Sequence, residues 1–275
     1  MERELVKISV RELVEFILRS GDLDNRVGGK KDAESMLAGA RIHRKIQKSM
    51  GSDYHAEVTL KHLIAMEKFD LQIEGRADGI IDGNPVTIDE IKGIYKSLEY
   101  LKEPVPVHLA QAKCYAYIYA IQNDKHDMEV QMTYVNLDTE QKIYFYEHYT
   151  VQELSEWFEN LVLEYKKWAE FRYEWKRLRN ASIKAIGFPY EYRDGQKELA
   201  GSVYRSILRE KRLFIQAPTG TGKTLASMFP SVKAMGEGLS EKIFYLTAKT
   251  ITRTVAANCL DLLRCQNLRM KSVLL

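Results

Sequence analysis

The chain has 275 residues, enough for one large domain or two ordinary ones, and its 45% hydrophobic content is ordinary for a globular protein. The formal net charge of +3 is too small to indicate a nucleic-acid partner, so any basic binding surface has to be local. Three cysteines provide neither a disulfide framework nor a zinc ligand set, which favours a reducing, cytoplasmic location. No apolar run approaches about 18 residues and no signal peptide is visible, so no membrane partner is expected.

Two helices are expected near the start of the chain. Ser9 and Glu12 form a capping-box pattern ahead of an apolar stripe with helical spacing. A second helix is expected over about 32–50, and it carries His43 on its apolar face. A lone histidine in such a place is usually a core or surface residue, and it becomes a ligand candidate only if carboxylates face it.

Strands are expected next, over about 56–66, 69–81 and 85–92. The last two flank a turn of Asp, Gly and Asn, which predicts a β-hairpin. If the loop is residues 82–84, Ile81 pairs with Pro85. A register slip of one residue would exchange the two faces of the second strand.

Asp78, Glu90 and Lys92 share one face of this hairpin in the expected register. Two carboxylates and an ammonium group together are typical of a divalent-metal site, because hard cations take carboxylate oxygens and keep several waters. The lysine could orient an attacking water or stabilise charge on a scissile phosphate. The alternative is a solvated edge hairpin of mixed charge.

A helix over about 108–121 carries Gln111 and Tyr115 one turn apart. These two side chains could bind a phosphate or a base, or could be a solvent-facing glutamine and a packed tyrosine. A second hairpin over 129–148 and a long helix over about 150–178 follow.

Four short motifs in this order resemble the RecB-like nucleases of the PD-(D/E)XK superfamily. They are Gly39…His43, Gly75-Arg76-Ala77-Asp78, Glu90-Ile91-Lys92 and Gln111…Tyr115. The resemblance implies an α/β fold with a restriction-endonuclease-like mixed sheet flanked by helices, over residues 1–180. It implies a DNA partner as well.

The same resemblance implies the roles of the site residues. The metal ligands, for Mg²⁺ or Mn²⁺, would be His43, Asp78, Glu90 and the carbonyl of Ile91. The catalytic set would be Asp78, Glu90, Lys92, Gln111 and Tyr115, with Lys92 as the catalytic lysine and the last two holding the DNA backbone. Some relatives carry an iron–sulfur cluster on four cysteines. This domain has only Cys114, so no such cluster is expected.

The second part of the chain contains a phosphate-binding loop. A buried strand is expected over 213–216, followed by Ala217-Pro-Thr-Gly-Thr-Gly-Lys223-Thr224 and a helix, which is the context of a Walker A loop. Backbone N–H groups around Gly220, Thr221 and Gly222 would wrap the phosphates of ATP. Lys223 would reach the β- and γ-phosphates and Thr224 would hold Mg²⁺.

From Phe188 the chain resembles the first motor domain of DinG/XPD-type superfamily 2 helicases. Gly187 and Pro189 break the helical pattern, which predicts a linker over 181–192, and another strand is expected over 242–247. The resemblance implies a partial RecA-like domain over 193–275. Arg193 and Gln196 would contact adenine, and Thr247 and its neighbours would touch the nucleic-acid backbone. The chain stops before the Walker B acids and the second motor domain. Helicase activity is therefore expected only in a full-length form, with the missing motor parts supplied by further domains or a partner chain.

These features together predict a metal-dependent deoxyribonuclease joined to an ATP-binding helicase segment, acting in DNA repair or processing. Three alternatives remain open: a nucleic-acid-binding module in which neither reaction runs, an unrelated P-loop ATPase or kinase with an accessory domain, and a structural interaction protein. The complete acid–acid–lysine set disfavours the first alternative. The Arg193/Gln196 pair and the segment 247–254 disfavour the second.

Overall fold

The computed structural model describes residues 3–20, 30–218, 220–248 and 250–274. The chain divides into two compact units, Met1–Glu170 (unit 1) and Phe171–Leu275 (unit 2). The division falls inside one long helix, α4 (Val151–Ala185), whereas a linker is expected from the sequence at 181–192. The helix continues because no glycine or proline interrupts the sequence before Gly187. None of the described helices is both long and apolar enough to cross a membrane.

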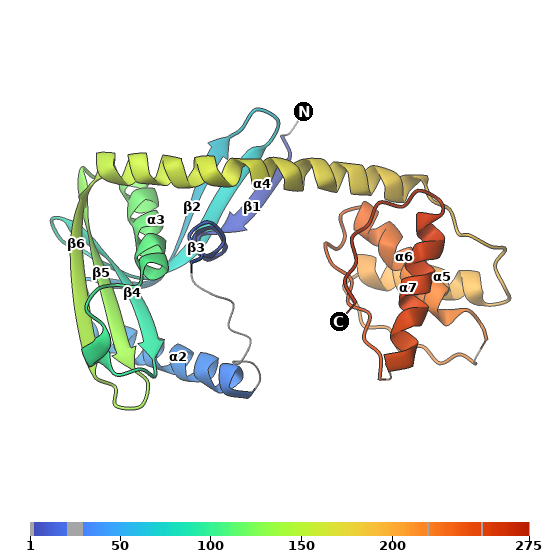
Figure 1. Cartoon of the computed structure of the whole chain (residues 1–275), viewed down its shortest axis with the longest axis horizontal. Coiled ribbons are helices and arrows are strands. Elements are labelled where there is room, and N and C mark those ends of the chain that lie inside the picture. Colours follow the sequence, from blue (N-terminus) through green and yellow to red (C-terminus); the bar gives the residue numbers. More distant parts are fainter. Residues whose placement is uncertain (1–2, 21–29, 219, 249, 275) are drawn as a thin grey trace. The chain divides into compact units, whose positions relative to one another are not determined.

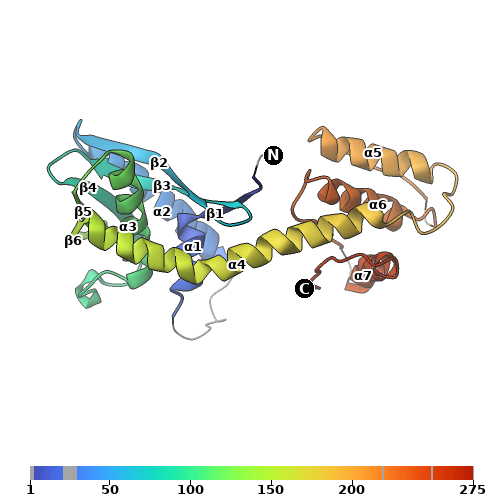
Figure 2. The same cartoon turned by 90° about the horizontal axis from the view of Figure 1, so that it is seen from above.

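Unit 1 is built on a mixed β-sheet (Figures 1 and 2). Before α4 its elements are β1 (Leu5–Ser9), α1 (Val10–Ile17), α2 (Lys30–Ser49), β2 (Tyr54–Ala65), β3 (Asp70–Ile81), β4 (Val86–Ile94), a short 3₁₀ turn (Leu98–Tyr100), α3 (Pro106–Gln122), β5 (Asp127–Asn136) and β6 (Lys142–Thr150). Within the described residues, six strands pair in the order β1-β3-β4-β5-β6, and β2 pairs with β3. The β1–β3 and β4–β5 pairs are parallel, and the other three pairs are antiparallel.

Local sequence signals account for the first helix. The side chain of Ser9 accepts a hydrogen bond from the backbone N–H of Glu12, and the Glu12 side chain accepts one from the backbone of Ser9, so the predicted capping box is confirmed. The apolar stripe of α1 is buried through Val10, Leu13 and Val14. This burial fixes the helix against the sheet and against α3.

The β3–β4 hairpin forms, but its expected register was wrong. Ile81 pairs with Thr87 and not with Pro85, so the connection is longer by two residues than the turn signal indicates. An even shift keeps every side chain on its expected face, because strand side chains alternate with period two. The face argument for Asp78, Glu90 and Lys92 therefore survives the error in loop length.

Helices cover both faces of the sheet, as expected for the fold class. Ile42 and Ile46 of α2 pack against Ile91 of β4, whereas Gln111 of α3 meets the adjacent residue Lys92. Successive side chains of a strand point to opposite faces, so α2 and α3 flank β4 from opposite sides. Figures 1 and 2 show α3 lying along the sheet, with the first part of α4 beside it. The predicted mixed sheet flanked by helices is confirmed for unit 1.

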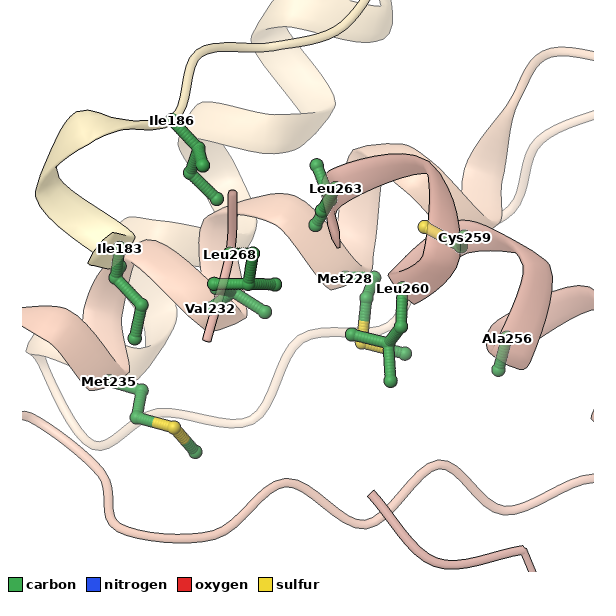
Figure 3. Close-up of a cluster of buried hydrophobic side chains, with 10 residues drawn as sticks. All are labelled: Ile183, Ile186, Met228, Val232, Met235, Ala256, Cys259, Leu260, Leu263 and Leu268. Carbon is green, nitrogen blue, oxygen red and sulfur yellow. The ribbon is translucent and has the colours of Figure 1, made fainter. Parts of the chain in front are cut away.

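Unit 2 consists of helices packed around one apolar cluster. Its further helices are α5 (Gln196–Leu208), α6 (Lys223–Gly236) and α7 (Thr250–Arg264). Figure 3 shows the cluster, to which the end of α4, α6, α7 and the segment after each of α4 and α7 contribute. Its buried members are Ile183, Ile186, Met228, Val232, Met235, Ala256, Cys259, Leu260, Leu263 and Leu268.

The two strands predicted in unit 2 are not formed. Residues 213–216 and 242–247 are irregular, and the described residues of unit 2 contain no strand. Phe214, Phe244 and Leu246 are 92%, 79% and 89% exposed. An apolar run becomes a strand only when neighbouring strands satisfy its N–H and C=O groups, and the sequence pattern does not report whether such neighbours exist. The expected strand assignments were therefore wrong for this structure.

Candidate active site

Helix α2 brings two polar side chains to Asp78. Because Ile42 and Ile46 face the sheet, His43 and Gln47 fall together on an adjacent stripe of the helix. The Nδ1 atom of His43 lies 3.2 Å from Asp78 Oδ1, and the amide of Gln47 donates a 2.9 Å hydrogen bond to the main-chain oxygen of Asp78. The helix therefore contacts both the side chain and the backbone of this aspartate.

The second oxygen of Asp78 turns toward β4. The backbone N–H of Ile91 donates a 2.9 Å hydrogen bond to Asp78 Oδ2. The last paired residues of the β3–β4 ladder are Gly79 and Asp89, so this bond ties the two strands together just beyond it. The Asp78 carboxylate is thereby fixed beside the strand that carries Glu90 and Lys92.

Glu90 is an almost fully buried carboxylate with only one of its oxygens paired. Its side chain is 1% exposed, and Oε1 accepts a 2.7 Å hydrogen bond from the ammonium group of Lys92. Among the described residues, Oε2 has no hydrogen-bond partner. Burial raises the pKa of Glu90 to about 7 against the opposing effect of Lys92, and the charge of Asp78 adds to the rise.

Helix α3 reaches the same site from the other face. Lys92 also donates a 3.2 Å hydrogen bond to the side-chain oxygen of Gln111. Burial raises the pKa of the Tyr115 hydroxyl, and the nearby side chain of Gln111 and backbone of Arg76 oppose that rise. This close approach requires a glycine at Gly75, where a Cβ atom would lie 2.6 Å from the Tyr115 hydroxyl. The glycine of the Gly-Arg-x-Asp motif thus makes room for the tyrosine.

Opposing effects act on the pKa of His43. Burial lowers its pKa, but the hydrogen bond and the negative charge of Asp78 outweigh burial and raise the pKa above its ordinary value. The ring is therefore held as a partner of Asp78. To act as a metal ligand it would have to give up its proton, which a divalent cation favours.

The donor set suits a hard cation, although it is not arranged around one. Among the described residues, no group of three or more His, Cys, Asp or Glu side chains is placed to hold a metal ion. The reason is that His43 is turned to Asp78, and Glu90 to Lys92. The unpartnered, buried Oε2 of Glu90 is the feature that a cation would satisfy.

A buried polar cluster behind β4 was missed in the sequence. Asp89 accepts hydrogen bonds from the hydroxyls of Tyr54 (3.0 Å) and Thr133 (2.6 Å) and from the amide of Gln131 (3.1 Å). Asp89 precedes Glu90, so it points to the opposite face of the strand. An aspartate on the same strand face as the apolar Ile91 was the available signal. Gln47, one turn beyond His43, was a second one.

The predicted phosphate-binding loop of unit 2 contains two glycines with positive φ. Gly220 and Gly222 have φ values of +86° and +73°, a conformation that L side chains rarely adopt. The ammonium group of Lys223 donates hydrogen bonds to the main-chain oxygens of Ala217 (2.6 Å) and Pro218 (2.7 Å). Thr221 also donates to the oxygen of Pro218, at 2.9 Å. The lysine side chain thus bonds to two carbonyl groups at the start of the loop.

Arg193 and Gln196 lie against this loop. The guanidinium group of Arg193 donates to the oxygen of Gly220, and the amide of Gln196 donates to the oxygen of Gly222 at 3.4 Å. Gln196 also accepts a hydrogen bond from the backbone of Arg193 at 3.1 Å. The two expected adenine contacts are therefore placed beside the loop, whereas Thr224 lies in the first turn of α6.

Comparison with known protein families finds a match within unit 2. Residues 197–273 match the family model of the DEAD/DEAH box helicases. Curated proteins gave no sequence match. A crystal structure of SSO0001 is similar over 57% of this chain and 75% of that chain, with a TM-score of 0.39 and 18% identity. An alkaline exonuclease from Laribacter hongkongensis is similar over 61% and 92%, with a TM-score of 0.35 and 11% identity. Unit 2 therefore contains a segment similar to the DEAD/DEAH box helicases.

Proposed function

We propose that unit 1 is a metal-dependent nuclease that hydrolyses phosphodiester bonds in DNA. The observation that carries this proposal is the buried carboxylate of Glu90, whose Oε2 has no partner among the described residues, beside Asp78 and Lys92. Burying a carboxylate with half of its hydrogen-bonding capacity unused is costly unless another charge offsets it. A divalent cation would offset that cost.

The groups that would hold the cation are the side chains of His43, Asp78 and Glu90 and the main-chain oxygen of Ile91. Carboxylate-rich sites of this kind suit Mg²⁺ or Mn²⁺. When bound, such a cation supplies a Lewis acid for a phosphate oxygen and an acidified water as nucleophile. For this binding, His43 has to release Asp78.

The remaining residues act on the substrate directly. Lys92 is held between Glu90 and Gln111, so its ammonium group is positioned to donate to a phosphate oxygen as negative charge develops there. Gln111 steadies the lysine from α3. Gln111 and Tyr115 contact the DNA backbone. The site thereby combines two carboxylates that can hold a cation with one fixed positive charge that can stabilise the phosphate.

Metal-dependent cleavage of labelled DNA tests the proposal. The parent chain should cut single- or double-stranded DNA with Mg²⁺ or Mn²⁺ and stop in chelator, and Asp78→Ala should lose cleavage. Asp82→Ala is the matched control, because Asp82 lies in the turn of the same hairpin and pairs with His55 at the surface. Cleavage by Asp78→Ala at the parental rate, or no cleavage with either metal, would overturn the proposal.

A non-catalytic DNA-binding module is the second candidate. The specific observation in its favour is that His43, Asp78 and Glu90 do not form a ready ligand cluster within the described residues. The same assay separates the two candidates. Binding of DNA without cleavage in either metal would support the module.

For unit 2 we propose an ATP-binding helicase segment that works with the nuclease in DNA repair or processing. The support is the φ geometry of Gly220 and Gly222 together with the bonds of Lys223 to carbonyl groups at the start of the loop. Lys223→Ala should weaken binding of a fluorescent ATP analogue, because the β- and γ-phosphates lose their cation. Lys242→Ala, an exposed lysine outside the loop, should bind like the parent. Equal binding by the two variants would contradict this role.

A further inference from the structure

Helix α2 carries a basic stripe on its solvent side. Arg41, Arg44, Lys45 and Lys48 occupy positions i, i+3, i+4 and i+7, which fall on one side of a helix, and all four are exposed. Residues 36–49 contain these four basic side chains and no acidic one, so this stretch has a formal charge of +4. The whole chain has only +3. This stretch therefore has a local positive charge that the small net charge of the whole chain does not reveal.

The basic stripe lies on a different side of α2 from the side that packs on the sheet and the side that contacts Asp78. Ile42 and Ile46 are buried against the sheet, and His43 and Gln47 contact Asp78. A nucleic-acid backbone lying along the basic stripe would consequently pass within about one helix diameter, on the order of 10 Å, of Asp78. The basic stripe and the residues that contact Asp78 therefore lie on the same helix.

An anion of the protein itself already occupies part of the stripe. Glu140, in the turn between β5 and β6, forms an ion pair with Lys45. The hydrogen bond from Lys45 lowers the pKa of Glu140, and the charges of Arg41 and Lys142 lower it further. The carboxylate of Glu140 thus lies where a phosphate group of DNA would lie. It is close to the positive charges of Lys45, Arg41 and Lys142.

We propose that Arg41, Arg44, Lys45 and Lys48 form a binding surface for the phosphate backbone of the DNA that unit 1 acts on. The inference rests on the proposed function, which supplies the substrate. Arg41 and Lys48 are about 10 Å apart along the helix axis, at about 1.5 Å per residue. That length corresponds to on the order of three nucleotide steps of a duplex, which rise by about 3.4 Å each along its axis.

The salt dependence of DNA binding tests this surface. Binding of a fluorescently labelled single-stranded DNA to the full chain is measured in chelator, so that no cleavage occurs, at several salt concentrations. Arg44→Gln/Lys48→Gln should bind more weakly, with a slope of log K against log salt shallower by about 1.4, because two phosphate contacts at about 0.7 each are lost. The matched control is Lys166→Gln/Lys167→Gln, which removes two exposed charges from α4 and should keep the parental slope.

Two further arms make the test independent of folding defects and of anion type. Glu140→Gln should bind DNA more tightly than the parent, because Lys45 and Arg41 lose their internal anion. Polyglutamate of matched charge should compete poorly. An unchanged slope in Arg44→Gln/Lys48→Gln, or equal competition by polyglutamate, would overturn the proposal. Because binding is measured without metal, loss of the nuclease proposal and loss of this surface give different results.

Discussion

The side-chain amide of Gln47 donates a 2.9 Å hydrogen bond to the main-chain oxygen of Asp78. This bond holds the backbone of the aspartate, while His43 contacts its carboxylate. A residue one helical turn from the expected ligand thus sets where the end of β3 lies relative to α2. Such outer contacts orient the groups that meet metal and substrate.

Replacing Gln47 with leucine should lower the cleavage rate about 10- to 100-fold, the usual effect of removing an outer hydrogen bond at a metal site. DNA affinity in chelator should not change, because Gln47 carries no charge. The concentration of Mg²⁺ needed for half-maximal cleavage should rise, which a general loss of packing would not cause. Gln122→Leu is the control, because it removes a similar bond to the main-chain oxygen of Lys61. Parental metal dependence in Gln47→Leu would exclude a positioning role.

Lys92→Ala should abolish cleavage and leave most of the DNA affinity. The ammonium group is the one ion-pair partner of Glu90 among the described residues, and it is placed to stabilise charge on the phosphate. Affinity depends mainly on many salt-sensitive phosphate contacts. Single-turnover cleavage and fluorescence anisotropy measure the two properties separately. Lys96→Ala, an exposed lysine just beyond β4, should behave like the parent. A Lys92→Ala variant that cuts normally would show that its role has been misassigned.

The same glycine-to-alanine change should have opposite effects at two positions in unit 1. At Gly79 a Cβ atom would lie 2.0 Å from the ring of Tyr54, so Gly79→Ala has to displace the ring and its bond to Asp89. We expect a loss of about 1–3 kcal/mol in the free energy of unfolding. At Gly39, in α2, a Cβ atom would meet nothing within 4 Å, and Gly39→Ala should add about 0.5–1 kcal/mol. Urea denaturation measures whether the free energy of unfolding falls in Gly79→Ala and rises in Gly39→Ala.

Acid should destabilise unit 1 through His108. Burial lowers the pKa of His108 to about 4, with the positive charge of Lys92 adding to the effect. Between about 6.5 and 4 the unfolded chain binds a proton that the folded chain does not, so stability falls as the pH falls through this range. His108→Gln should remove on the order of 1 kcal/mol of this loss at about pH 5, a value reduced for partial exposure. Equal pH dependence in parent and variant, measured by urea denaturation, would contradict the assigned pKa.

The fold of unit 1 was largely readable from residue patterns, and its failures have physical causes. Period-two alternation and the turn residues predicted the β3–β4 hairpin, but loop length depends on backbone geometry, so the pairing of Ile81 was displaced by two residues. The sequence order of the motifs located His43, Asp78 and Glu90. It did not report that Asp89 would be buried in a hydrogen-bonded cluster, because Tyr54 and Thr133 are distant in the chain.

Unit 2 shows more plainly which features a sequence pattern cannot predict. The glycine pattern of a Walker A motif predicted a loop before α6, and Gly220 and Gly222 have the positive φ that such a local turn requires. The strands on either side of it are a non-local property, since each needs a neighbour to pair with. Residues 213–216 and 242–247 have the composition of strands and are irregular all the same.

Helix α2 has one side that packs on the sheet, one that contacts Asp78 and one that carries the basic stripe. These three sides limit where residues can be inserted into the helix. One inserted residue between His43 and Gln47 would rotate everything beyond it by about 100°. Gln47 would leave Asp78, Ile46 would leave the sheet, and Lys48 would turn away from the solvent side. An insertion of about seven residues, close to two full turns, would nearly restore all three directions. Insertions after Ser49, where the helix ends, leave the three sides in place. Natural variation in length is therefore expected beyond Ser49 and not between His43 and Lys48.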